Sequence, residues 1–119
     1  MYAAIRILPE YECSPIWVSK DGVTYSNLDL SYFEDTLKGA LFQWDQQFQN
    51  TFNRADPPSS CFCNKREHTL FELEGLLFWH ILLGQNKNTT ISYWSTLFER
   101  EFFDINEFEQ KLLSIIGRI

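Results

Sequence analysis

A nearly continuous apolar segment over residues 70–83 constrains the fold of this chain more than any other feature. As a helix this segment is apolar almost all round. A helix of that kind needs apolar partners on several sides, so we expect it to lie at the centre of the fold. Thr69-x-x-Glu72 predicts its capping box, and Gly84 predicts its end. Gly75 predicts the close approach of a neighbouring backbone.

A second helix is predicted over residues 32–53, with Ser31-x-x-Glu34 as its capping box. Its apolar residues recur at spacings of three and four, which places them in one stripe that faces a core. Phe42 lies outside this stripe. The stripe consists of Phe33, Leu37, Ala40, Leu41, Trp44, Phe48 and Phe52.

Short segments rich in β-branched residues predict strands at residues 3–8 and 15–19. Asp21-Gly22 predicts a tight turn that leads into a third strand at residues 23–25. A later strand is predicted at residues 89–94, and we expect it to return to the same sheet.

The carboxy-terminal part of the chain predicts two further helices. Thr96-x-x-Glu99 indicates a short helix at residues 97–103, and Asp104-x-x-Glu107 caps a last helix. The order of elements predicts an α+β fold, in which a small antiparallel sheet packs with three to four helices. That sheet comprises the amino-terminal meander and the one later strand. The 119 residues suit a single domain, 1–119.

Composition excludes several classes of protein. An aromatic content of 17% excludes intrinsic disorder. Sixteen acidic and ten basic residues give a net charge of -6, so we expect no nucleic-acid partner, because neutralising phosphates requires lysine and arginine. The apolar run at residues 76–83 is too short to cross a bilayer, so we expect no membrane partner. The first residues lack a secretory signal and the three cysteines suit reduced thiols, so we expect a cytoplasmic protein.

Cysteines and histidines offer the first candidates for chemistry. Cys61 and Cys63 form a close pair, and His68 with the distant Cys13 completes a set of four soft ligands. Structural zinc sites place two to four residues between paired cysteines, whereas a single residue separates Cys61 from Cys63 and no second close pair exists, so we expect no metal and no cofactor. An enzyme that uses Cys61 or Cys63 with a histidine is the weakest alternative, because no catalytic motif with a known mechanism is present. We therefore predict no catalytic residues.

Acidic residues gather in two groups, which are the candidate binding residues. Helix caps and the helix macrodipole account for several of these carboxylates but not for the whole set. An acidic surface attracts a basic partner and exposed aromatic residues anchor interfaces, so the sequence predicts a protein-binding surface. The first group comprises Asp29 and Asp35 with Phe42, and the second comprises Glu99, Glu101, Asp104, Glu107 and Glu109.

A set of motifs spread over most of residues 5–84 carries a resemblance to a known family. The motifs are Tyr11-Glu12-Cys13-Ser14-Pro15-Ile16-Trp17, an acidic residue before Leu30-Ser31, the series Leu37, Leu41, Trp44 and Phe48, the Asp56-Pro57-Pro58 loop, and Phe71-Glu72-x-Glu74-Gly75. Together they resemble the small immunity proteins that bacteria make beside contact-dependent-inhibition and other polymorphic toxins.

The resemblance implies a protein without catalysis that binds one cognate toxin domain 1:1 and blocks its active site or substrate entry. Such toxins are often nucleases with basic clefts, which suits an acidic and aromatic inhibitor. The resemblance carries over no contact residues, because immunity proteins diverge most where they touch the toxin. The alternative, from a different class, is a non-catalytic interaction or adaptor subunit, or a homo-oligomer, without a toxin partner.

Overall fold

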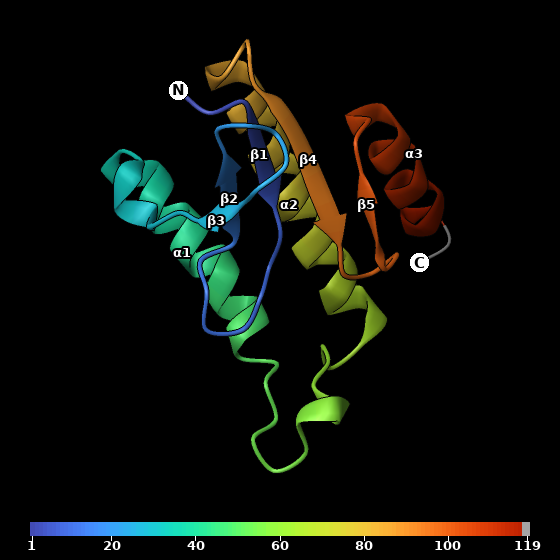
Figure 1. The fold of residues 1–119 in the computed structure, drawn as a ribbon. Coiled ribbons are helices and arrows are strands. Elements are labelled where there is room, and N and C mark those ends of the chain that lie inside the picture. The colour runs from blue at the N-terminus through green and yellow to red at the C-terminus, as the bar shows by residue number, and fades with distance from the viewer. Residues whose placement is uncertain (118–119) are drawn as a thin grey trace.

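The computed structural model describes residues 1–117, which form a five-stranded mixed sheet and three α-helices (Figure 1). The strands of this part of the chain are ordered β3-β2-β1-β4-β5, with β1 and β4 parallel and the other pairs antiparallel. The strands are β1 (Ala4–Ile7), β2 (Ile16–Ser19), β3 (Ser26–Asn27), β4 (Thr90–Ser95) and β5 (Arg100–Phe102). The helices are α1 (Asp35–Gln49), α2 (Lys65–Gln85) and α3 (Ile105–Ile116), with short 3-10 helices η1 (Leu30–Tyr32) and η2 (Pro57–Ser59).

The predicted α+β class is confirmed, and so is the return of the later strand to the amino-terminal sheet. That strand, β4, pairs with β1 in register from Ala4 opposite Thr90 to Ile7 opposite Tyr93. Because the β1–β4 pair is parallel, the sheet is mixed rather than wholly antiparallel, and the unpredicted strand β5 pairs antiparallel with β4 at the edge.

A single apolar core joins one face of the sheet to the three helices. Trp44 of α1 stacks on Phe71 of α2 with 4.6 Å between ring centroids, and its indole N–H donates to the Phe71 carbonyl at 2.9 Å. On the other side of α2, Tyr93 of β4 stacks on Trp79 and lies 4.6 Å from Phe108 of α3. Aromatic side chains therefore fix α2 to both neighbouring helices and to the sheet.

Segment 23–25 is not a strand. The Asp21 carboxylate accepts hydrogen bonds from the amides of Val23 and Thr24, each at 2.8 Å, and Gly22 has a φ of 80°. Those amides are therefore not available for a strand ladder, and the pairing begins only at Ser26 in β3. The same hydrogen bonds lower the pKa of Asp21 to about 2.

Two predicted helix starts are wrong. The Glu34 side chain itself caps α1 by accepting from the amides of Thr36 and Leu37, while Ser31 lies in η1. Helix α2 begins at Lys65, several residues before the predicted start, and continues past Gly84 to Gln85. Thr69 lies buried inside α2, where its hydroxyl donates to the Lys65 carbonyl at 2.8 Å.

Asn64 is the cap that the sequence analysis missed, and its side chain accepts from the Glu67 amide at 2.8 Å. We expect Asn64→Ala to lower the free energy of unfolding by about 1 kcal/mol, because one amide of the first turn loses its partner. Asn88→Ala, in the exposed turn after α2, is the matched control and should change stability by less than about 0.5 kcal/mol. Urea denaturation measures both, and equal losses in the two variants would mean that Asn64 does not cap α2.

The helix predicted at residues 97–103 is a turn followed by β5. The Ser95 hydroxyl accepts from the Phe98 amide at 2.9 Å, and Glu99 adopts a left-handed conformation with a φ of 56°. The chain therefore reverses and brings Phe102 into the core, fully buried. The last predicted helix is confirmed as α3, and the Asp104 side chain caps it by accepting from the Asn106 amide at 2.9 Å.

Candidate binding surface

The carboxy-terminal acidic group does not form one free patch, because most of its members have partners within the fold. Glu101 lies on the sheet face away from the helices, where it accepts from the Arg6 guanidinium at 2.7 Å and from the Ser92 hydroxyl at 2.6 Å. Its side chain is 18% exposed. Glu101 therefore holds β1, β4 and β5 together at their outer face.

The remaining members lie on the turn before β5 and on the first turns of α3. Asp104 caps α3, Glu107 pairs with Arg100 at 2.8 Å, and Glu109 lies 3.3 Å from the His80 ring of α2. Within residues 1–117 the Glu99 carboxylate makes no ion pair, and the residue is exposed on the turn. The structure thus brings these residues together near β5 and α3. Glu101, Asp104, Glu107 and Glu109 each contact another group in the fold, whereas the Glu99 carboxylate makes no ion pair within residues 1–117.

The amino-terminal group is partly brought together. Asp29 and Phe42 line one hollow of about 730 Å³ beside α1, and the Phe42 side chain is 55% exposed. Asp29 also caps η1, and the hydrogen bond from the Ser31 amide lowers its pKa. Asp35 lies exposed on the first turn of α1, 3.9 Å from Lys38, and does not line this hollow.

Asp45 is a residue of the same hollow that the sequence analysis missed. Its side chain is 6% exposed, and burial raises the pKa of its carboxyl to about 6. Its amide partner is Gln49 Nε2, at 3.3 and 3.4 Å from the two carboxylate oxygens. Its position next to Trp44, at the margin of the apolar stripe, was the sequence feature that could have indicated its burial.

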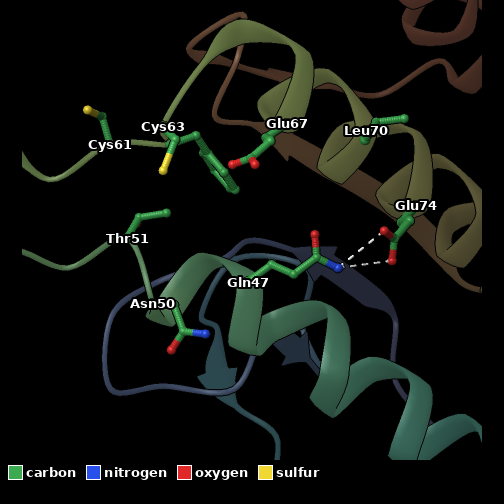
Figure 2. Close-up of a pocket in the computed structure, with 9 residues that line it drawn as sticks. Gln47, Asn50, Thr51, Cys61, Cys63, Glu67, Leu70 and Glu74 are labelled. Carbon is green, nitrogen blue, oxygen red and sulfur yellow. Dashed lines mark hydrogen bonds between the residues drawn. The ribbon is translucent and has the colours of Figure 1, made fainter.

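A second hollow, of about 490 Å³, separates the end of α1 from the start of α2 (Figure 2). The segment between α1 and α2, residues 50–64, contributes Cys61 and Cys63, and α2 contributes Glu67 and Glu74. Figure 2 shows Gln47 of α1 reaching across to Glu74, whose carboxylate oxygens accept from the Gln47 amide at 3.2 Å. The Gln47–Glu74 contact therefore bridges this hollow between α1 and α2.

The candidate zinc ligands are not assembled. No group of three potential metal-ligating side chains exists within residues 1–117, and Cys61 and Cys63 are exposed free thiols. His68 stacks on Phe62 at 4.4 Å, and its Nε2 lies 2.7 Å from the Thr96 hydroxyl. His68 thus links the segment between α1 and α2 to the turn before β5, and burial lowers the pKa of His68.

The most buried charged group is Glu72 of α2, which is 0% exposed. Its carboxyl accepts from the Tyr93 hydroxyl at 2.5 Å, from the Ser95 hydroxyl, and from the Leu97 amide at 3.4 Å. Burial outweighs these hydrogen bonds and raises its pKa to about 7. Because every partner belongs to β4 or the turn after it, this cluster holds the fold and faces no solvent-accessible site.

A comparison with family models relates the chain to immunity proteins. The model described as Serratia CdiI immunity protein-like matches residues 3–96. The chain belongs to this family. The resemblance found in the sequence is therefore confirmed. A comparison with the curated proteins gives no match.

CdiI immunity proteins are non-catalytic inhibitors, so family membership confirms that this chain is not an enzyme. Membership also implies neutralisation of a toxin through binding of a cognate CdiA toxin domain. The match ends at Thr96, so β5, α3 and the whole carboxy-terminal acidic group lie beyond it. None of the described helices combines the length and the apolar content that crossing a membrane requires.

Proposed function

We propose that this CdiI-type chain neutralises a nuclease toxin domain by binding it 1:1 in the cytoplasm and blocking its active site or substrate entry. The observation that carries the nuclease assignment is the net charge of -6, of which several carboxylates are exposed. A nuclease cleft is basic because it binds phosphates, so an acidic protein associates with it rapidly and selectively. Carboxylates then stand where substrate phosphates would sit.

Both acidic groups contribute to the contact surface that we propose. In the carboxy-terminal group, Glu99, Asp104, Glu107 and Glu109 are available at the surface, whereas Glu101 adds to the local field from its place beside Arg6. In the amino-terminal group, Asp29 and Asp35 supply charge, and the exposed Phe42 ring supplies an apolar anchor.

Association kinetics test the electrostatic part of this proposal. We expect a Glu99→Lys/Glu109→Lys protein to associate with the cognate CdiA toxin domain about tenfold more slowly at low salt. The difference should shrink as salt is added, because ions screen exposed charges. Glu101 is left unchanged, since a lysine there would face Arg6 inside the fold.

The matched control is Glu10→Lys/Asp56→Lys, which changes the net charge equally at exposed sites outside both groups. Stopped-flow measurements give the association rates, and a toxicity-rescue assay reports protection. Equal slowing in both double variants would show that only net charge matters and that the carboxy-terminal group is not the contact. Failure of the unaltered protein to bind or protect would contradict the proposed pairing itself.

A further inference from the structure

The outer side of α2 is apolar and uncovered. Leu70, Leu77 and Ile81 are 50%, 61% and 41% exposed, although the sequence predicted a helix covered on several sides. Spacings of seven and four residues place the three side chains on one side of the helix, opposite the side that packs on the sheet. We call these three residues the outer α2 stripe.

Such a stripe is unusual in a chain whose other large apolar side chains mostly build a core. Helices α1 and α3 both contact α2, but they lie beside it and leave its outer side open. Leu113, one turn after Glu109 on α3, adds a fourth aliphatic side chain that is 50% exposed. Exposed aliphatic groups that share one helix face are typical of a surface that binds another protein.

Carboxylates border the outer α2 stripe on both sides. Glu67 and Glu74 lie on the side facing α1, where Figure 2 shows Glu67, Leu70 and Glu74 on successive turns. Glu109 lies on the side facing α3, where it contacts His80 at 3.3 Å. Arg66 is the basic residue near the amino-terminal end of the stripe. An apolar centre with an acidic border fits a partner whose apolar side chains are surrounded by basic ones.

We propose that the outer α2 stripe is the apolar centre of the interface with the cognate toxin domain. Its occupant is a toxin surface that carries aliphatic or aromatic side chains among lysines and arginines. The inference rests on the proposed function. Glu109 of α3 contacts His80 of α2, and at this contact the carboxy-terminal acidic group meets α2. A second copy of the chain fits less well, because each copy carries a net charge of -6 and the two acidic borders would meet.

The test compares three single variants that each add one negative charge at an exposed apolar residue. Leu77→Asp and Ile81→Asp change the stripe, whereas Val23→Asp is the matched control, since Val23 is 81% exposed in the loop between β2 and β3. The probe is the purified cognate CdiA toxin domain. We expect each stripe variant to bind it at least tenfold more weakly, mainly through faster dissociation, while Val23→Asp binds normally.

Two further measurements make each outcome decisive. Thermal unfolding of the variants shows whether the fold is kept, as we expect for side chains this exposed. If an aspartate variant unfolds, the serine variant at the same position replaces it. Unchanged toxin binding by folded Leu77→Asp and Ile81→Asp would overturn the inference while leaving toxin neutralisation intact. If the unaltered protein sediments as a dimer that Leu77→Asp dissociates with no loss of toxin binding, a second copy occupies the stripe and the inference is also overturned. Absence of toxin binding by the unaltered protein would instead refute the proposed function.

Discussion

Replacing Gly75 by alanine is expected to lower the free energy of unfolding by about 2–4 kcal/mol. Gly75 is buried in α2, and the space that a Cβ would occupy there is already filled by the hydroxyl and ring atoms of Tyr93. The close approach predicted at Gly75 is therefore real, but a side chain of β4 makes it rather than a backbone. A methyl group at this position forces Tyr93 to move.

Tyr93 has no room to move. It is fully buried, it packs against Trp79 and Phe108, and its hydroxyl donates to Glu72 at 2.5 Å. Displacing the ring would break that hydrogen bond and disturb aromatic contacts on both sides, and a tightly packed core relaxes little. The destabilisation therefore exceeds the small gain in helix propensity that alanine brings over glycine.

Gly39→Ala is the matched control, because Gly39 also lies inside a helix but has open space where the Cβ would be. We expect this variant to gain up to about 1 kcal/mol of stability, since alanine restricts the unfolded chain and favours the helix. Urea denaturation of the two variants gives the comparison. Similar stability changes at Gly39 and Gly75 would show that Tyr93 does not fill the space beside Gly75.

The sequence predicts the parts of this fold whose pattern is repeated over many residues. The stripe of α1, the apolar content of α2 and the β-branched segments of β1, β2 and β4 each contain enough residues to identify the element. Their burial against one another then follows, because amphipathic elements have few ways to cover their apolar faces.

Single-residue signals are less reliable, because the same short pattern serves different structures. Thr69-x-x-Glu72 has the form of a capping box, yet both side chains are buried within α2, where Glu72 binds β4 and Thr69 binds its own helix. Thr96-x-x-Glu99 has the same form and lies in a turn. Which pattern caps a helix depends on tertiary contacts that the local sequence does not contain.

For the candidate site, too, the sequence predicts the broad pattern but not the contacts of individual residues. The sequence predicts where acidic residues gather, but it does not predict that Arg6, from the other end of the chain, neutralises Glu101. The sequence also does not predict the exposure of Leu77 and Ile81. An apolar helix has the same sequence pattern whether its outer side is covered by the same chain or by a partner protein. Pairings between distant residues and vacant helix faces become visible only once the fold is known.

Glu72→Gln is expected to remove a loss of stability that the unaltered protein suffers between pH 4.5 and pH 7. The folded protein holds the Glu72 proton up to about pH 7, whereas the unfolded chain releases it near the ordinary pKa of 4.5. Stability from this group is therefore fully present below pH 4.5 and falls as the pH rises toward 7, by about 3 kcal/mol in total. Glutamine stays neutral and keeps an oxygen that accepts hydrogen bonds, so the variant escapes this loss.

Other groups also titrate in this range, so the informative quantity is the difference between the two proteins. Asp45, with a raised pKa, changes stability in the same direction as Glu72, and His68, with a lowered pKa, changes it in the opposite direction. Both are present in either protein and cancel in the difference. We expect the stability of Glu72→Gln relative to the unaltered protein to rise by about 3 kcal/mol between pH 4.5 and pH 8.

Glu72→Ala separates the charge of this residue from its hydrogen bonds. Alanine leaves the hydroxyls of Tyr93 and Ser95 without their buried acceptor and opens a cavity beside them. We expect a loss of about 3 kcal/mol or more at pH 5, where the native carboxyl is protonated and carries no charge penalty. Urea denaturation at pH 4.5, 5, 6, 7 and 8 measures all three proteins. A stability difference between Glu72→Gln and the unaltered protein that does not change with pH would mean that Glu72 keeps its ordinary pKa, and that its three donors compensate fully for its burial.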